Sequence, residues 1–375
     1  MAIAADYAIV GSGLTGATIA RLLADAGREV LVLERRSHVG GNVHDHLHPS
    51  GVRVHTYGPH YFRTNSQEIW EFVHRFARFH PYHAVVKSRV DGRLESWPVT
   101  EEYIRRAIGV RWMPEFRARP TNFEEACLRM MPRAVYEKFV KGYTEKQWGV
   151  PATALSPSLA GRFEVRRNGD ERLKLHRYQG IPRGGYASFM RQMLEGIPVF
   201  LNFDYLERRE EVRARRLLIY TGPIDEFFNF DLGKLRYRAQ QRGHRYLNDS
   251  EYVLPVGQVN YPSPADGPQI RELEWKHMME PGEVKAARGT LVTTETPYDP
   301  SDPDHYEYPF PDESNQRLYR AYASRASGIP GVLICGRLGE YRYYDMDQAI
   351  ARAMTLVRRI LVQDRAMGTL VGSRA

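Results

Sequence analysis

Cysteine is scarce in this sequence, and long apolar runs are absent from it. The 375 residues include two cysteines, Cys127 and Cys335, which lie far apart. This spacing gives neither a disulfide framework nor a cysteine-based metal cluster, so we expect no metal and a reducing, cytoplasmic environment. No stretch of about 18 apolar residues occurs, which predicts no membrane span. The chain leads directly into an apolar run at 7–10, so no signal peptide is expected.

The chain is basic, but its basic residues are not clustered. The formal net charge is +8 and the isoelectric point is about 9.3. Lysine and arginine are spread along the chain and mixed with acidic residues, without a basic tail or a nucleic-acid motif. We therefore expect no nucleic-acid partner and favour a basic cleft for a phosphorylated small molecule. The 23 tyrosines suit sugar and nucleotide sites, although most must serve ordinary packing.

Apolar segments typical of buried parallel strands occur near both ends of the chain. Residues 7–33 indicate a strand, a glycine turn, a helix over roughly 15–26 that stops at Gly27, and a second strand. Further buried strands are predicted at 217–220 and 332–335, before a closing helix over 347–361. Between these ends, residues 66–148 are predicted to be mostly helical (67–77, 101–108 and 123–141), 150–186 to be a loop-bearing connection, and 235–295 to form an antiparallel sheet.

A dinucleotide-binding pattern stands at the first turn. Gly11, Gly13 and Gly16 follow the first strand and open the helix, so they permit a tight turn, a close approach to a pyrophosphate and close helix packing. The helix N-terminus offers free N–H groups to phosphates. Glu34 ends the second strand, where an acid accepts ribose hydroxyls.

The residues just after Glu34 favour FAD over NAD. Arg35 and the Gly40-Gly41-Asn42 stretch are typical of FAD enzymes of the glutathione-reductase and amine-oxidase type, and so is a late Gly336-Arg337 after a strand. The fold class we predict is α/β, a Rossmann-like FAD-binding domain assembled from discontinuous segments with a helical insert and an antiparallel-sheet domain. We assign 1–65, 190–232 and 325–375 to the FAD-binding domain, 66–150 to the helical domain, and 151–189 and 233–324 to the antiparallel-sheet substrate domain with a mobile loop.

Several segments over nearly the whole chain resemble the UDP-galactopyranose mutase family. The most specific are the Tyr-Thr-Glu-Lys-Gln-Trp and Gly-Arg-Leu-x-Glu-Tyr-x-Tyr-Tyr-Asp-Met stretches. The segments that carry the resemblance are Gly11–Ala17, Tyr57–His60, Lys141–Gly149, Arg177–Pro182, Tyr220–Asp225 and Gly336–Met346.

The resemblance implies an unusual use of FAD. Reduced FAD acts through N5 as a covalent nucleophile on the anomeric carbon, a nucleotide leaves and returns, and the sugar ring recloses with no net redox change. It implies UDP-galactose or UDP-N-acetylgalactosamine as substrate, and we expect a homodimer. The protein must hold the diphosphate, stabilise its charge and exclude water.

By this resemblance, residues of this chain are carried over to three roles. Residues expected to contact the reacting groups are Arg162, Arg271, Arg337, Tyr343, His60 and Asp345. Residues expected to hold FAD are Gly11, Gly13, Thr15, Gly16, Glu34, Arg35, Gly41, Asn42, Tyr57, Gly58, Gly336, Arg337, Tyr344, Asp345 and Met346. Residues expected to bind the nucleotide sugar are Arg63, Phe139, Tyr143, Thr144, Trp148, Arg162, Leu173, Asn260, Arg271, Tyr308, Arg337 and Tyr343.

Plain structural roles are the alternative for several of these residues. Arg162 could be solvated, Arg271 could form a strand ion pair worth about 0–1 kcal/mol, and Trp148 could be ordinary core. Tyr343 could serve strand packing, and Asp345 could cap the last helix.

Two positions depart from the family pattern. Arg63 stands where the family usually has His, and its five donors could reach a 2-acetamido carbonyl or simply pair with a neighbouring carboxylate. Leu173 replaces a Tyr that would donate to a phosphate, so that contact is missing or comes from Arg172 or Lys174. Three alternatives therefore stay open: another nucleotide sugar such as a dTDP-6-deoxy sugar, a flavin oxidase of the amine-oxidase type, and an inactive sugar-nucleotide-binding protein.

Overall fold

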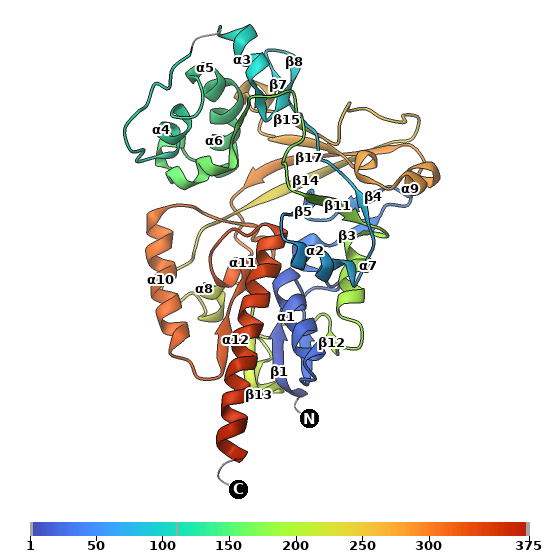
Figure 1. Ribbon diagram of the computed structural model, residues 1–375, viewed down its shortest axis with the longest axis vertical. Coiled ribbons are helices and arrows are strands. Elements are labelled where there is room, and N and C mark those ends of the chain that lie inside the picture. Colours follow the sequence, from blue (N-terminus) through green and yellow to red (C-terminus); the bar gives the residue numbers. More distant parts are fainter. Residues whose placement is uncertain (1–2, 110–111, 373–375) are drawn as a thin grey trace.

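The computed structural model describes residues 3–109 and 112–372, with side chains described as far as residue 366. Its lower part in Figure 1 is built around a five-stranded parallel sheet in the order β12-β2-β1-β13-β19. The sheet joins segments far apart in sequence. Its strands are β1 (Ile3–Val10), β2 (Val30–Leu33), β12 (Val199–Phe200), β13 (Val212–Tyr220) and β19 (Val332–Ile334).

Helices cover this parallel sheet, and two of them pack on each other. The first helix, α1 (Leu14–Asp25), runs beside the long C-terminal helix α12 (Met346–Gly372), drawn in red in Figure 1. Leu23, Val32 and Ile350 are buried in the core that these elements share. The other helices of this part are α7 (Gly185–Met193), α8 (Ile224–Phe227), α10 (Glu313–Ser327) and α11 (Gly336–Gly339). The predicted parallel strands and the closing helix are confirmed.

A seven-stranded sheet lies above, in the order β18-β14-β17-β16-β15-β7-β8. All its neighbouring strands are antiparallel except β15 and β7, which run parallel. This confirms the antiparallel sheet expected over 235–295. Its strands are β7 (Val86–Val90), β8 (Arg93–Trp97), β14 (Tyr237–Leu247), β15 (Gln258–Asn260), β16 (Arg271–Glu274), β17 (Thr290–Tyr298) and β18 (Tyr308–Pro309).

Smaller sheets and turns connect the two parts. The three-stranded antiparallel sheet β5-β11-β6 brings the segment before α2 beside the segment before α7. Its strands are β5 (Phe62–Thr64), β6 (Phe79–Pro81) and β11 (Tyr178–Pro182), and α2 is Gln67–His74. Further elements are β3 (Asp45–Leu47), β4 (Arg53–His55), β9 (Val99–Thr100), β10 (Val165–Arg166), α9 (Pro281–Ala286) and the 3-10 helices η1 (Gly41–Val43), η3 (Ala152–Ala154), η4 (Pro157–Arg162), η5 (Arg209–Glu211), η6 (Pro264–Asp266), η7 (Trp275–Met278) and η8 (Pro303–His305).

A cluster of short helices packs on one end of the large sheet, at the upper left of Figure 1. Phe123, Tyr136 and Val140 are fully buried in its separate core. The cluster consists of α3 (Glu101–Ala107), α4 (Phe123–Leu128), α5 (Arg133–Val135), the π-helix η2 (Tyr136–Lys141) and α6 (Gly142–Trp148).

Two predictions within 66–148 were wrong. Residues 86–97 are strands, because Val86, Ser88 and Val90 alternate as buried positions with more exposed neighbours, a period of two and not a helical one. The single helix expected over 123–141 is interrupted after Leu128, where Pro132 supplies no backbone N–H and starts α5. The domain boundaries themselves stay a prediction, and the stretch assigned as 325–375 extends beyond the described residues.

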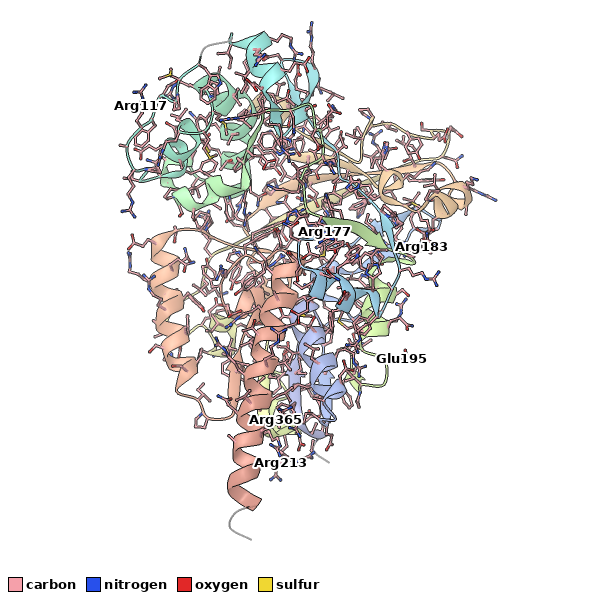
Figure 2. All side chains as sticks on the ribbon, in the orientation of Figure 1. Arg117, Arg177, Arg183, Glu195, Arg213 and Arg365 are labelled. Atoms are coloured by element: carbon pink, nitrogen blue, oxygen red, sulfur yellow. The ribbon has the colours of Figure 1, made fainter. Side chains whose placement is uncertain are left out.

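Charged side chains are spread over the molecule. The labelled Arg117, Arg177 and Arg183 lie on the upper part of the protein and Arg213 and Arg365 on its lower end, and all five are exposed (Figure 2). In the described part of the chain, no helix is both long and apolar enough to cross a membrane.

Candidate functional site

The glycine turn closes tightly between β1 and α1. Gly11 has a φ of +98°, and an ideal Cβ there would lie 2.2 Å from Thr221 Oγ1. An ideal Cβ on Gly16 would lie 2.0 Å from the carbonyl oxygen of Gly11, so α1 approaches the turn as closely as a glycine allows. The turn therefore has the geometry that a pyrophosphate-binding strand–turn–helix requires.

Glu34 fixes this turn from the end of β2. The carboxylate is buried, and its Oε2 accepts hydrogen bonds from the Ser12 N–H (2.8 Å) and hydroxyl (2.5 Å). Its Oε1 accepts from the Arg36 N–H at 2.9 Å. The predicted ribose-binding acid thus lies beside the glycine turn. One cavity is lined by it and by other predicted FAD residues, namely Gly11, Gly13, Thr15, Gly16, Arg35, Gly41, Asn42, Gly336, Arg337, Tyr344 and Met346.

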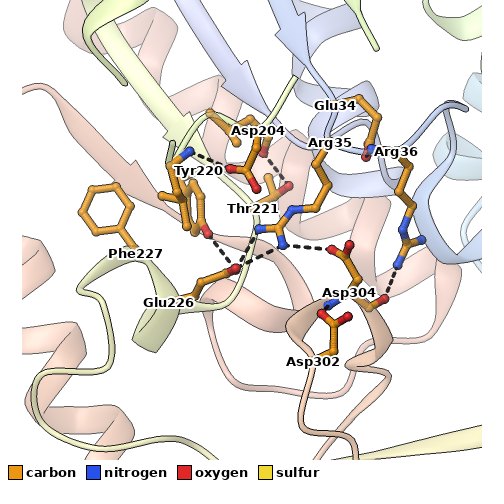
Figure 3. Close-up of polar contacts among 12 residues, drawn as sticks. Glu34, Arg35, Arg36, Asp204, Tyr220, Thr221, Glu226, Phe227, Asp302 and Asp304 are labelled. Carbon is orange, nitrogen blue, oxygen red and sulfur yellow. Dashed lines mark hydrogen bonds and ion pairs between the residues drawn. The ribbon is translucent and has the colours of Figure 1, made fainter. Parts of the chain in front are cut away.

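The two arginines after Glu34 leave in different directions (Figure 3). Arg35 donates to both oxygens of Glu226 (3.1 and 2.8 Å) and to Asp304 Oδ1 (2.9 Å). Arg36 donates to the Asp304 carbonyl and to Asn42 Oδ1, and its guanidinium lies 4.3 Å from the Tyr57 ring centre. Both line the dinucleotide cavity, so Arg36 is a site candidate that the sequence reasoning missed although it directly follows Arg35.

A second cavity adjoins the first. The two share Asn42, His60, Arg337 and Met346. The second is also lined by the predicted residues Tyr57, Gly58, Arg63, Tyr308, Tyr343 and Asp345, and by Glu307, which was not predicted.

Arg63 and Asp345 form an ion pair in this second cavity. Arg63 Nη2 donates to Asp345 Oδ2 at 3.2 Å, and the two side chains are 19% and 33% exposed. Burial alone would raise the pKa of Asp345, but Arg63, and then Arg162, holds it below its ordinary value. Asp345 is therefore negatively charged and paired with Arg63. Pairing with a neighbouring carboxylate was one of the two roles that the sequence suggested for Arg63.

His60 is held neutral. Burial lowers the pKa of its imidazole well below the ordinary value, and His55 and Arg337 lower it further. Its Nδ1 is buried without a hydrogen-bond partner in the described part of the protein, and Arg63 Nε is in the same condition. Unpaired buried polar atoms in a cavity wall suit a polar ligand.

A third, largely aromatic cavity joins the second at Tyr308 and Tyr343. The π-helix η2 places Phe139 here, and α6 places Tyr143 and Thr144 about one turn on and Trp148 about one turn after them. Thr144 Oγ1 is buried and lacks a partner among the described residues. Predicted residues here also include Arg162, Leu173, Asn260 and Arg271, and unpredicted ones are Trp97, Phe123, Gln147, Leu159, Phe163 and Gln258.

Two arginines approach Tyr343. The Arg162 guanidinium carbon lies 3.9 Å from the Tyr343 ring centre, and that of Arg337 lies 4.8 Å away. Arg162 is an exposed residue at the end of η4, and Arg337 lies in α11. Two cations from distant segments thus meet where the second and third cavities join, a geometry that favours an anionic ligand.

Arg271 enters the third cavity from β16. Its Nε donates to the buried carboxylate of Glu295, so it forms a strand ion pair and also lines the cavity. Burial alone would lower the pKa of Arg271, but Glu295 holds it well above the ordinary value. This arginine therefore stays charged in a nearly enclosed position.

Leu173, the other residue that departs from the family pattern, lies in a well-defined local structure. Leu173 lines the third cavity, and its N–H donates to the Ala84 carbonyl at 2.7 Å. Arg172 pairs with Asp170, and Lys174 Nζ donates to the Arg162 carbonyl at 3.3 Å. Neither basic neighbour lines any of the three cavities, so neither substitutes for the missing tyrosine in this structure.

Comparisons with known proteins match most of the chain. A family model described as UDP-galactopyranose mutase matches residues 138–343, and an NAD(P)-binding Rossmann-like model matches 9–76. The chain is 34% identical over 361 residues to a probable UDP-galactopyranose mutase of Klebsiella pneumoniae, with 92% of each covered. It is 30% identical over 367 residues to a dTDP-fucopyranose mutase of Escherichia coli, with 92% of this chain and 96% of that one covered.

Solved structures share the fold. A reduced UDP-galactopyranose mutase gives a TM-score of 0.73 at 15% identity, with 96% of each chain covered. A putrescine oxidase with bound putrescine gives 0.60 at 14% identity, with 96% and 99% covered. Together with the glycine turn and Glu34, the match to the family model and to the relative from Klebsiella pneumoniae indicates FAD as the dinucleotide of the first cavity.

Proposed function

Because the chain belongs to the UDP-galactopyranose mutase family, we propose that it uses bound FAD to interconvert the pyranose and furanose forms of UDP-galactose or UDP-N-acetylgalactosamine. The observation that carries this proposal is that three neighbouring cavities share lining residues in sequence. The dinucleotide cavity shares His60 and Arg337 with a polar middle cavity, and that cavity shares Tyr308 and Tyr343 with an aromatic one.

Each cavity suits one part of the reaction. The reduced flavin supplies an electron-rich N5 for nucleophilic catalysis without net redox change. Arg162, Arg271 and Arg337 hold the diphosphate and stabilise its negative charge as it leaves. Phe139 and Tyr143 pack against the base, while Asp345 and His60 face the sugar.

A second nucleotide sugar is the alternative that a specific observation favours. The relative from Escherichia coli is a dTDP-fucopyranose mutase, and Leu173 removes a hydroxyl from the cavity that we assign to the nucleotide. We therefore keep a dTDP-6-deoxy sugar as the second candidate. The likeness to putrescine oxidase extends to the fold alone and favours no oxidase activity.

The test is incubation of dithionite-reduced protein with a panel of UDP- and dTDP-sugars, followed by detection of furanose products. We expect yellow protein that releases FAD and not FMN on denaturation, activity only when reduced, and no net oxidation of the sugar. Equal turnover by air-oxidised protein would contradict the nucleophilic role of the flavin. Colourless protein that FAD does not reconstitute would contradict the proposal as a whole.

A further inference from the structure

Four charged side chains of alternating sign form a chain that runs from the wall of the third cavity to the wall of the middle one. Arg271 Nε donates to Glu295 Oε2, and Arg242 Nε donates to Glu295 Oε1 at 2.9 Å. Arg242 Nη1 and Nη2 then donate to the two oxygens of Glu307 at 2.8 and 2.9 Å. Glu295 therefore accepts from each arginine through a different oxygen, and Arg242 donates to both Glu295 and Glu307.

The strand register fixes this arrangement. Glu295 of β17 pairs directly with Arg242 of β14 on one side and with Arg271 of β16 on the other. The Glu295 side chain is fully buried, and those of Glu307, Arg242 and Arg271 are 7%, 10% and 14% exposed. Water thus screens these contacts little, and the geometry of each carboxylate determines what its neighbours can bind.

The division of Glu295 between two arginines has a consequence for Arg271. Arginine and carboxylate prefer a bidentate pairing through two nitrogens and two oxygens. Because Arg242 occupies Oε1, Glu295 contacts Arg271 through Nε and leaves the terminal Nη nitrogens without a carboxylate partner in the described structure. Those nitrogens form the fork whose hydrogen bonds a phosphate group would accept.

The same chain of charges reaches the second cationic residue of the site. Arg337 Nη1 donates to the backbone carbonyl of Glu307 at 3.3 Å, and Glu307 itself lines the middle cavity. The loop that contains Gly58 packs closely against Glu295 and Arg242. An ideal Cβ on Gly58 would lie 2.8 Å from Glu295 Oε1 and 3.1 Å from Arg242 Nη2.

We propose that Arg242 and Glu307 are positioning residues for diphosphate binding: they hold Glu295 so that the guanidinium fork of Arg271 stays available to phosphate oxygens. The inference rests on the proposed function, because a diphosphate is the ligand that Arg271 would hold. Without Arg242, Glu295 turns both oxygens onto Arg271, neutralises it and competes with the phosphate.

The test replaces the pair together. Removing one partner leaves an unpaired buried charge, whereas Arg242→Met with Glu307→Met leaves none and preserves side-chain volume. We expect the double variant to fold and bind FAD, and its dissociation constant for UDP or dTDP, whichever the unaltered protein binds more tightly, to rise about tenfold or more. Affinity for the corresponding nucleoside, uridine or thymidine, is expected to change less than about twofold.

The single variant Arg242→Lys provides a second measurement. A lysine retains the charge beside Glu295 but loses the fork to Glu307, so an intermediate loss of diphosphate affinity is expected. The matched control is Arg208→Met with Glu211→Met, an exposed pair on η5 and its flank, which should change neither affinity.

The comparison of ligands separates the outcomes. Unchanged UDP and dTDP affinity in both variants, or equal losses for nucleoside and nucleoside diphosphate, would overturn the positioning role. Failure of the unaltered protein to bind either nucleoside diphosphate would overturn the proposed function itself.

Discussion

At the scale of single residues, Arg162 and Arg337 both pack on Tyr343, and we expect both to be required for activity. Replacing either arginine by Ala should lower kcat/KM on the order of 10²-fold or more, the scale of a lost charged contact to a transition state. Lysine should rescue only in part, because it has no planar fork. Steady-state kinetics of the reduced enzyme measure this. Rates near the unaltered value in both Ala variants would show that the diphosphate binds elsewhere.

Arg63 permits a prediction about the sugar. Its contact with Asp345 leaves Nε unpaired among the described residues, so the side chain can still donate to a ligand. A charge-assisted hydrogen bond to an acetamido carbonyl is worth roughly 1.5–3 kcal/mol. Arg63→His should therefore lower kcat/KM for UDP-N-acetylgalactosamine about 10- to 100-fold, and much less for UDP-galactose.

Comparison of the two substrates is what makes the Arg63 test decisive. An equal loss on both would assign Arg63 to holding Asp345, because that role does not depend on the 2-substituent. No turnover of the acetamido sugar by the unaltered enzyme would exclude the acetamido contact.

At the scale of elements, the glycine turn before α1 should tolerate no side chain at its third glycine. Gly16→Ala would place Cβ 2.0 Å from the backbone oxygen of Gly11, so α1 must move away from β1. We expect a lower melting temperature and loss of bound FAD, measured by thermal unfolding and by flavin absorbance. Gly282→Ala in α9, where no atom beyond the adjacent residues and the helix's own backbone lies within 4 Å of the new methyl, is the control. Full FAD content in Gly16→Ala would contradict the close approach.

Elements with a local signal were predictable, and those that depend on partners were not. The run 30–33 and the glycines before α1 indicate a strand and a phosphate-binding turn without further context. The strands at 86–97 were missed because each is short and joins a sheet completed by β15, far along the chain. The candidate site shows the same division: Tyr343 and Arg337 were predicted from a motif and line its cavities, whereas Glu307, Arg242 and Asp304 contact partners that only the fold brings near.

At the scale of the whole molecule, the dinucleotide cavity is lined by a segment that follows a strand of the parallel sheet and by a segment that connects two strands of the large sheet. Arg35 follows β2 of the parallel sheet, while Asp304 lies in η8, between strands β17 and β18 of the large sheet (Figure 3). Pro303 and Asp304 line the cavity beside Glu34. The contacts of Asp304 with Arg35 and Arg36 therefore connect the two parts across the end of the cavity where the ribose is expected.

This connection should govern how slowly FAD leaves. The Asp304 side chain is 48% exposed, so its pair with Arg35 contributes about 0.2–1 kcal/mol and is screened by salt. Asp304→Asn should accelerate FAD release by up to about fivefold and reduce the salt dependence of the release rate. The rate is measured from the rise in flavin fluorescence when FAD leaves the protein. Glu226 keeps Arg35 in place in that variant, so the fold should persist. Asp249→Asn, an equal change of charge on an exposed loop, should leave the rate unaltered. A release rate and salt dependence in Asp304→Asn equal to those of the unaltered protein would show that η8 does not retain the cofactor.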